Sequence, residues 1–160
     1  MSVEQARKLP DSELKAKPNF TRRQLDVLSG RAQGLDNIEI AKKLGISSNT
    51  VRAHFREIAL MIGTGDVHGS IIAMEVSLRE GMIDVDGIVN KGIVPLSLRE
   101  VSILRLIATG KSDEQIRVLL ERSLHTVRAQ ERSINNKLHA RSRFHAVAIG
   151  LVNGIIDSSF

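Results

Sequence analysis

The tetrapeptide Thr-Val-Arg-Ala occurs twice in the sequence, at residues 50–53 and 126–129. A second arginine follows four residues after the first in each copy, so that both guanidinium groups lie on one face of a helix. A guanidinium group donates paired hydrogen bonds to guanine or binds a phosphate, and an alanine methyl group contacts the methyl group of thymine. These residue types at this spacing are suited to the major groove of DNA. The two outer faces comprise Asn49, Arg52, Ala53 and Arg56, and His125, Arg128, Ala129 and Arg132.

The two copies belong to a longer internal repeat. A shift of 76 positions aligns residues 20–63 with residues 96–139, and 13 of the 44 pairs are identical. Self-similarity at a fixed period indicates repeated structural units. We therefore divide the chain into an N-terminal arm (1–19), a first unit (20–84), a linker (85–95) and a second unit (96–160).

Capping signals and apolar periodicity predict four short helices in each unit. Four pairs of residues have the composition and spacing of a capping box: Thr21 and Gln24, Asp36 and Glu39, Ser97 and Glu100, and Ser112 and Gln115. Ser47 and Ser123 follow tight turns and are expected to cap the third helices, a pattern typical of a helix-turn-helix. Fourth helices are expected near 71–79 and 143–152. The expected fold is therefore all-α, with two consecutive four-helix units and no strand.

Composition excludes several classes of function. The chain has no cysteine and no tyrosine, which excludes disulfides, cysteine zinc sites and a covalent tyrosine link to DNA. The histidines lack a third ligand or a nucleophile, so we expect no metal, no cofactor and no enzyme activity. Without an N-terminal apolar run, a cytoplasmic protein is expected. The net charge of +5 is concentrated in the second unit and suits a polyanionic partner.

With these motifs placed, the chain resembles two consecutive LuxR/NarL-type (GerE-type) helix-turn-helix domains. The family opening, close to Leu-Thr-x-Arg-Glu, appears as Phe-Thr-Arg-Arg-Gln at 20–24 and Leu-Ser-Leu-Arg-Glu at 96–100. The recognition-helix motif Thr-Val-Lys/Arg-x-His appears as Thr-Val-Arg-Ala-His at 50–54 and Thr-Val-Arg-Ala-Gln at 126–130. The resemblance covers all of the chain except the first 19 residues and the linker.

The resemblance implies double-stranded DNA as the partner and assigns roles to specific residues. Contacts to bases and phosphates fall to Arg52, Ala53, Arg56, Arg128, Ala129 and Arg132. Contacts to the DNA backbone fall to Arg23, Thr50, His54, Arg99, Thr126 and Gln130. The fourth helices of this family usually pair, which implies a homodimer or an intrachain pseudo-dimer through Ile72, Val76, Ala146, Ile149 and Val152.

The second unit departs from the family pattern at three positions. Arg117 replaces a small alanine, Glu121 replaces the glycine of the turn, and Arg122 replaces an apolar residue that plugs the core. A looser or rotated helix-turn-helix is expected there. The arm is too short for a receiver or small-molecule domain, so we expect no built-in sensor.

Two interpretations of function follow from these motifs. The first is a sequence-specific transcriptional regulator of bacterial or phage type. The second is an interaction module in which one degenerate repeat docks on RNA polymerase or another regulator. A sigma-like region or an excision accessory factor is a further DNA-related alternative. The sequence does not predict the operator, the sign of regulation or the effector.

Overall fold

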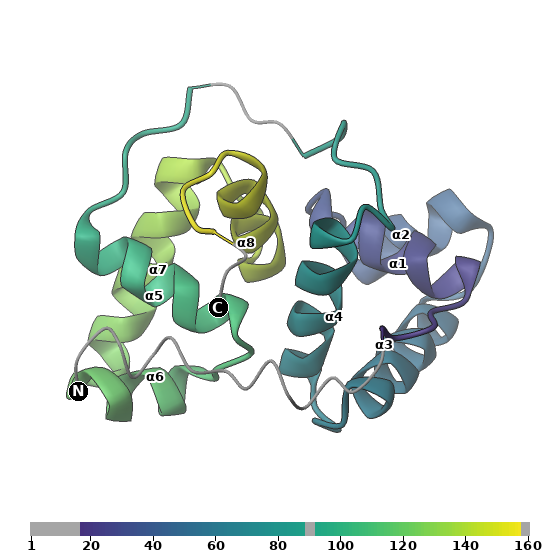
Figure 1. Ribbon diagram of the computed structural model, residues 1–160, viewed down its shortest axis with the longest axis horizontal. Coiled ribbons are helices and arrows are strands. Elements are labelled where there is room, and N and C mark those ends of the chain that lie inside the picture. Colours follow the sequence, from purple (N-terminus) through teal and green to yellow (C-terminus); the bar gives the residue numbers. More distant parts are fainter. Residues whose placement is uncertain (1–16, 89–91, 158–160) are drawn as a thin grey trace.

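The computed structural model describes residues 17–88 and 92–157, and all of this part that is regular is helical. Most of the predicted arm (1–16), residues 89–91 of the predicted linker and residues 158–160 lie outside the described residues. The helices are α1 (Arg22–Ala32), α2 (Asn37–Leu44), α3 (Ser48–Ile62), α4 (Val67–Arg79), α5 (Leu98–Ala108), α6 (Asp113–Leu120), α7 (Leu124–Leu138) and α8 (Arg143–Val152) (Figure 1). The all-α prediction is confirmed.

Side-chain caps fix where these helices begin. All four predicted capping boxes form, at the starts of α1, α2, α5 and α6. In the box of α1, the Thr21 hydroxyl accepts from the backbone N–H of Gln24 at 3.2 Å, and the Gln24 side chain accepts from the Thr21 N–H at 2.9 Å. Ser47 and Ser123 cap α3 and α7 as predicted. The repeat is therefore a repeat of local structure as well as of sequence.

Helix α4 begins earlier than the sequence predicted. Its start was expected near residue 71, after a glycine-rich stretch, but the helix begins at Val67 inside that stretch. The reason is Asp66, whose carboxylate accepts from the backbone N–H of Gly69 at 3.2 Å and caps the helix. Helix α8 has the expected bounds, with Ser142 as its cap.

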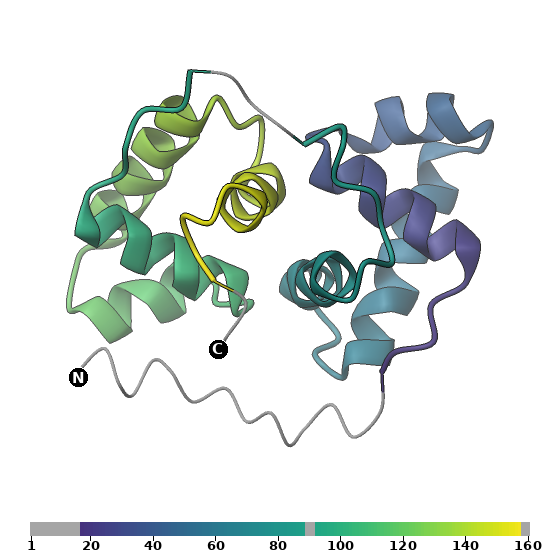
Figure 2. The same ribbon diagram turned by 45° about the horizontal axis from the view of Figure 1, so that its top comes forward.

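Helices α4 and α8 lie side by side between the two units (Figures 1 and 2). Around this pair the contacts are reciprocal, because α8 also packs on α1 and α4 also packs on α5. Two glycines mark the reciprocity. A Cβ atom on Gly34 would overlap the imidazole of His145, and one on Gly110 would lie 2.8 Å from Ile72 Cδ1. Each fourth helix thus packs a side chain against the glycine that follows the first helix of the other unit.

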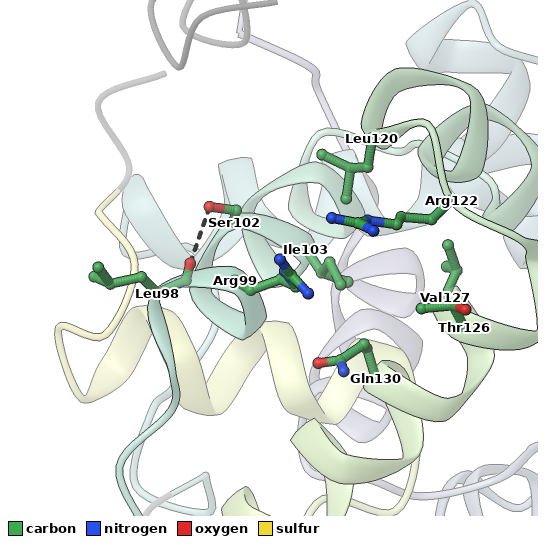
Figure 3. A pocket seen from close by; sticks show the side chains of 9 residues that line it. All are labelled: Leu98, Arg99, Ser102, Ile103, Leu120, Arg122, Thr126, Val127 and Gln130. Atoms are coloured by element: carbon green, nitrogen blue, oxygen red, sulfur yellow. Dashed lines mark hydrogen bonds between the residues drawn. The ribbon is translucent and has the colours of Figure 1, made fainter.

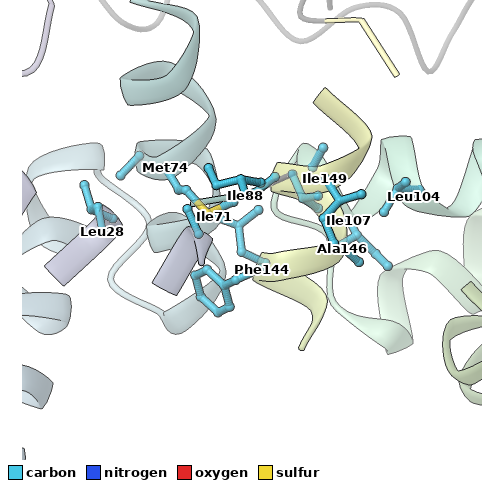
Figure 4. Close-up of a cluster of buried hydrophobic side chains, with 14 of the residues drawn as sticks. Leu28, Ile71, Met74, Ile88, Leu104, Ile107, Phe144, Ala146 and Ile149 are labelled. Atoms are coloured by element: carbon cyan, nitrogen blue, oxygen red, sulfur yellow. The ribbon is translucent and has the colours of Figure 1, made fainter. Parts of the chain in front are cut away.

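Both units share one hydrophobic core. Figure 4 shows buried side chains of α1, α4, α5 and α8 in a single cluster. At its edge, the ring of Phe144 lies 6.4 Å from that of Phe55, and the Arg31 guanidinium stacks over both rings. An ion pair of 3.0 Å between Arg141 and Glu39 also joins the units. The duplicated halves are therefore packed as one body.

Candidate nucleic-acid interface

The turn between the second and third helix of each unit sets the direction of the third helix. In the first unit Gly45 has a left-handed backbone (φ 68°), and the N–H of Ile46 donates to the carbonyl of Ala41 at 3.0 Å. In the second unit Glu121 has the same conformation (φ 52°), and Arg122 N–H donates to Arg117 at 2.9 Å. Glu121 adopts a conformation that favours glycine, so the turn itself keeps the geometry of the first unit. The looser or rotated helix-turn-helix as a whole stays a prediction.

Helix α3 carries the first candidate recognition surface. Ser47 accepts from the N–H of Thr50 at 3.0 Å, and their hydroxyl groups lie 2.8 Å apart, which anchors the first turn. Beyond this cap, Asn49 and Arg52 are exposed and joined by a 3.3 Å hydrogen bond from the guanidinium to the amide oxygen. Arg56 is exposed and makes no ion pair among the described residues.

Ala53 is half-buried on the same helix. It lies between the two arginines in sequence and adds no bulk beyond a methyl group. The outer face of α3 therefore presents two extended cations with little steric hindrance, a geometry compatible with insertion into a groove about 12 Å wide.

Helix α7 has the same frame with a different electrostatic environment. Ser123 caps it through the N–H of Thr126 at 3.1 Å, and His125, Arg128 and Arg132 are exposed. Unlike Arg52, Arg128 forms an ion pair, with its Nε 3.3 Å from Asp113 Oδ2. Arg132 has no acidic partner in the described part of the chain.

Asp113 is the centre of a small acidic network. Its other oxygen accepts from Arg143 at 2.7 Å, and Arg143 also bonds Glu131 at 3.0 Å. Burial raises the pKa of Glu131, although the charge of Arg143 opposes that rise. The network holds α6, α7 and α8 together and draws Arg128 toward a carboxylate.

The residues predicted to contact the DNA backbone lie in different surroundings. Arg23 is exposed at the start of α1, 3.8 Å from Asp26, and Arg99 occupies the matching place on α5 without an acidic neighbour among the described residues. His54 is half-buried, with Nδ1 3.6 Å from Glu57 Oε2. Thr126 and Gln130 are half-buried side chains of α7. His54, Thr126 and Gln130 therefore lie on the helices that carry the recognition arginines, whereas Arg23 and Arg99 lie on the first helix of each unit.

Family comparison agrees with this geometry. Residues 18–69 and 94–149 match the GerE model, described as bacterial regulatory proteins of the luxR family. The chain belongs to the luxR family. No curated protein and no solved structure matched it in the corresponding searches. The resemblance predicted from the motifs is thereby confirmed, and each matched segment of this luxR-family chain contains one helix-turn-helix.

Membership of the luxR family indicates that the chain is a transcriptional regulator with DNA-binding domains. Between residues 17 and 157, leaving out 89–91, no helix is long and apolar enough to span a membrane. Over the same residues no three His, Asp or Glu side chains are grouped as metal ligands would be.

The two units of this luxR-family chain differ in the share of their lysine and arginine residues that form ion pairs. In residues 96–157, five of the ten form ion pairs with residues that the structure describes: Arg117, Arg128, Lys137, Arg141 and Arg143. In residues 20–84, two of the eight form such pairs: Arg23 and Arg79. The more basic unit therefore holds more of its cations in internal pairs, and net charge alone overstates what it offers to phosphates.

Helix α7 is also tied to α5 through a buried carboxylate. Glu100 accepts from Lys137 at 2.8 Å, from Ser133 at 2.6 Å and from the N–H of Ser97 at 2.8 Å. Burial works against ionisation, but these hydrogen bonds prevail and lower the pKa of Glu100 to about 2. The first unit has Gln24 at this place, which donates to Glu57 on α3 at 3.4 Å.

Several residues at the interface were not singled out from the sequence. Asp113 was missed as a partner of Arg128. The repeat contained a signal for it, because the matching residue of the first unit is the neutral Asn37. Arg22 and Lys42 were missed as exposed cations beside α3. Their matching residues, Leu98 and Val118, are apolar.

The five predicted pairing residues lie on α4 and α8. Ile72 is half-buried against Gly110, and Val76, one turn later, is buried. Ala146 and Ile149 are buried, and Val152 is half-buried at the end of α8. Ile149 is one turn beyond His145, the residue that packs on Gly34. Whether this packing serves to present the recognition helices to DNA stays a prediction.

Proposed function

We propose that this protein is a sequence-specific DNA-binding transcriptional regulator that reads the major groove with α3 and α7. The observation that carries the proposal is the matched pair of outer faces, each with two exposed arginines one helical turn apart after a capped helix-turn-helix. Direct readout requires donors that reach base edges from a narrow element, and arginines on a short helix meet that requirement.

In this proposal the intrachain packing of α4 on α8 takes the place of a dimer contact. The reciprocal contacts at Gly34 and Gly110 support a pseudo-twofold arrangement of the two units. A twofold reader binds two half-sites separated by about one helical turn, roughly 10 base pairs. The single chain would then recognise an imperfect palindrome, with half-sites that differ because the outer faces of α3 and α7 differ.

The test is a binding-site selection with the full chain, followed by footprinting and light scattering. We expect one conserved site with two half-sites, bound by a monomer, and a steep loss of affinity with salt. Arg52→Ala and Arg56→Ala should relax the preference at individual positions of one half-site. Arg79→Ala, which removes one charge from α4, is the matched control and should leave the preference unchanged. Selection of no consensus, with equal loss on all sequences, would reduce the proposal to nonspecific binding.

Regulation is tested separately, by transcription in vitro from a template that carries the selected site. The expected result is a change in transcript level that depends on the site and is lost in Arg52→Ala. An unchanged transcript level on a template that is demonstrably bound would contradict a regulatory role.

A further inference from the structure

The second unit has a cavity beside its recognition helix. The cavity has a volume of about 260 Å³ and lies between α5, the α6–α7 turn and α7 (Figure 3). Ile103 and Val127, both buried, form its apolar wall together with Leu120. Leu98, Arg99 and Arg122 border it on the exposed side. The site is thus an apolar hollow with a basic rim.

The replacement of an apolar residue at the turn contributes to this cavity. In the first unit the residue after the turn glycine is Ile46, which is half-buried and packs against the core. The matching residue of the second unit is Arg122, whose side chain is exposed. An arginine keeps its charged group in water and cannot supply the apolar contacts of an isoleucine. The space that Ile46 helps to fill in one unit is therefore open in the other.

The size of the cavity selects the kind of occupant. Sites for drug-sized ligands measure roughly 300–1,000 Å³ and bury most of the ligand surface. This cavity is smaller and open on one side, so it suits a single branched or aromatic side chain that projects from a larger molecule. Leu98 beside it is 89% exposed and extends the apolar surface outward.

The rim selects the charge of the occupant. Arg99 and Arg122 are exposed, and neither forms an ion pair within the residues that the structure describes. Two unpaired guanidinium groups beside an apolar hollow favour an apolar residue flanked by carboxylates, because arginine binds carboxylates through paired hydrogen bonds.

The neighbouring surface is less suited to phosphates than its counterpart in the first unit. Leu98 replaces Arg22, and Val118 and Leu119 replace Lys42 and Lys43. Val118 is 60% exposed on α6. Three cations are lost here while two, Arg117 and Arg122, are gained, so this surface has one cation fewer than its counterpart. Exposed apolar side chains are a feature of protein-binding surfaces.

We propose that this cavity and its rim form a docking site for an acidic segment of a partner protein, with one leucine- or phenylalanine-type side chain as anchor. The anchor packs on Ile103 and Val127, and carboxylates of the segment bind Arg99 and Arg122. Thr126 and Gln130 also line the cavity, so a bound segment covers residues that DNA would otherwise approach. Docking and DNA contact by the second unit therefore exclude each other.

The test selects peptides from a displayed library of random 12-residue sequences with the full-length protein as target, and then compares the affinity of the enriched peptides for the wild type and for Arg122→Ile. Arg122→Ile restores the residue type of Ile46, closes the cavity and removes one rim charge. Leu98→Arg restores the residue type of Arg22 at an exposed position where the fold is not at risk. Thermal unfolding of both variants verifies that they remain folded.

We expect enriched peptides to share an apolar or aromatic residue among Asp and Glu, and to bind Arg122→Ile at least about tenfold more weakly than the wild type. Leu98→Arg should also weaken them, by a smaller factor. Peptides that bind Arg122→Ile equally well, or enrichment of basic or uncharged peptides, would overturn the proposal.

DNA-binding measurements on the same variants distinguish a failure of the docking proposal from a failure of the proposed DNA-binding function. Affinity of the wild type, Arg122→Ile and Arg122→Ala for the selected DNA site is measured in the same buffer. Equal affinities are expected, because the proposal assigns Arg122 to a protein partner. A drop in DNA affinity with a reduced salt slope would make Arg122 a phosphate contact and overturn the docking site. Failure of DNA binding in the wild type would contradict the proposed function while leaving the peptide result to stand by itself.

Discussion

The two recognition helices share a frame and differ in what surrounds their arginines. Among the described residues Arg52 of α3 is bonded to the neutral Asn49, whereas Arg128 of α7 is paired with Asp113. The residue that matches Asp113 in the first unit is Asn37. The carboxylate of Asp113 attracts Arg128, whereas Asn37 accepts a hydrogen bond from Arg31, and no carboxylate of the described residues pairs with Arg52. From this comparison we expect the distribution of acidic partners, more than net charge, to decide which unit binds DNA more tightly.

The turns differ in the same direction. The first unit has Gly45 and Ile46, a residue suited to a left-handed backbone followed by an apolar plug. The second unit has Glu121 and Arg122 in these places and keeps the geometry at the cost of backbone strain and an open cavity. We infer that the first unit is the better reader of DNA and that the second is partly specialised for another partner.

The largest expected effect concerns whether the two units are independent. Phe144 of α8 packs on Phe55 and under Arg31, both in the first unit. Truncation of a buried phenylalanine costs about 3–5 kcal/mol, so Phe144→Ala should lower the stability of the whole chain in one transition. Denaturant unfolding measures this, with Leu98→Ala as an exposed control within about 0.5 kcal/mol of the wild type. Two separate transitions, with only one shifted, would show that the units fold independently.

The second prediction compares the two arginines directly. Arg52→Ala should weaken specific DNA binding by about 1–3 kcal/mol. Arg128→Ala should cost less, because Arg128 must leave Asp113 before it reaches DNA. Affinities for the selected site, measured at one salt concentration, provide the ratio. A larger loss for Arg128 than for Arg52 would reverse the assignment of the first unit as the better reader.

The third prediction concerns stability at acid pH, to which the first and second units should contribute differently. The lowered pKa of Glu100, about 2 in the folded chain, contributes stability that is complete above the ordinary glutamate range. That stability is lost as pH falls from about 4.5 toward 2, at no more than about 1.4 kcal/mol per pH unit. Glu100→Gln, which gives the second unit the residue type of Gln24, should reduce the loss of stability over this pH range. Chemical unfolding at several pH values tests it, and an unchanged slope would contradict the role of Glu100.

An exposed carboxylate provides the control for this experiment. Glu114 lies on the surface of α6 and pairs with Arg117, which lowers the pKa of Glu114. Because water screens this pair, Glu114→Gln should leave the acid slope close to that of the wild type.

The fourth prediction concerns the turn. A left-handed conformation is unfavourable by roughly 1–2 kcal/mol for residues other than glycine. Glu121→Gly should therefore stabilise the chain by about 1 kcal/mol, and Gly45→Glu should destabilise it by a similar amount. Melting temperatures of the two variants test the comparison. Destabilisation by Glu121→Gly would imply that the glutamate side chain has a stabilising contact that outweighs the strain.

The smallest expected effect concerns the carboxylate beside Arg128. Asp113→Asn makes the second unit resemble the first, removes the ion pair with the exposed Arg128, worth about 0–1 kcal/mol, and weakens the half-buried pair with Arg143. We expect DNA affinity to rise by no more than about fivefold. The same DNA titration tests this variant. A fall in affinity for Asp113→Asn would show that Asp113 positions Arg128 for DNA instead of withholding it.

Local features of the fold were predictable because their signals are local. Capping boxes at Thr21 and Ser112 need only two residues three positions apart, and the exposed arginines follow from helical spacing. The ion pair between Arg128 and Asp113 was not predictable from spacing, because it depends on how α6 crosses α7. The cavity beside Arg122 was predicted in part. The sequence showed that the apolar residue after the turn is missing, but it did not show that the backbone would keep the turn geometry and leave a space.

The reciprocal packing at Gly34 and Gly110 has a consequence for the order in which the chain matures. During synthesis the first unit leaves the ribosome before α8 exists, so the surface around Gly34 stays uncovered until His145 of α8 is made. Domains usually fold from the N-terminus as they emerge, but here the earlier half finishes only when the later half arrives. A nascent chain that stops within α7 would retain the recognition helix α3 and an exposed surface around Gly34. Chaperones and proteases would act on this exposed surface before the chain could compete for DNA.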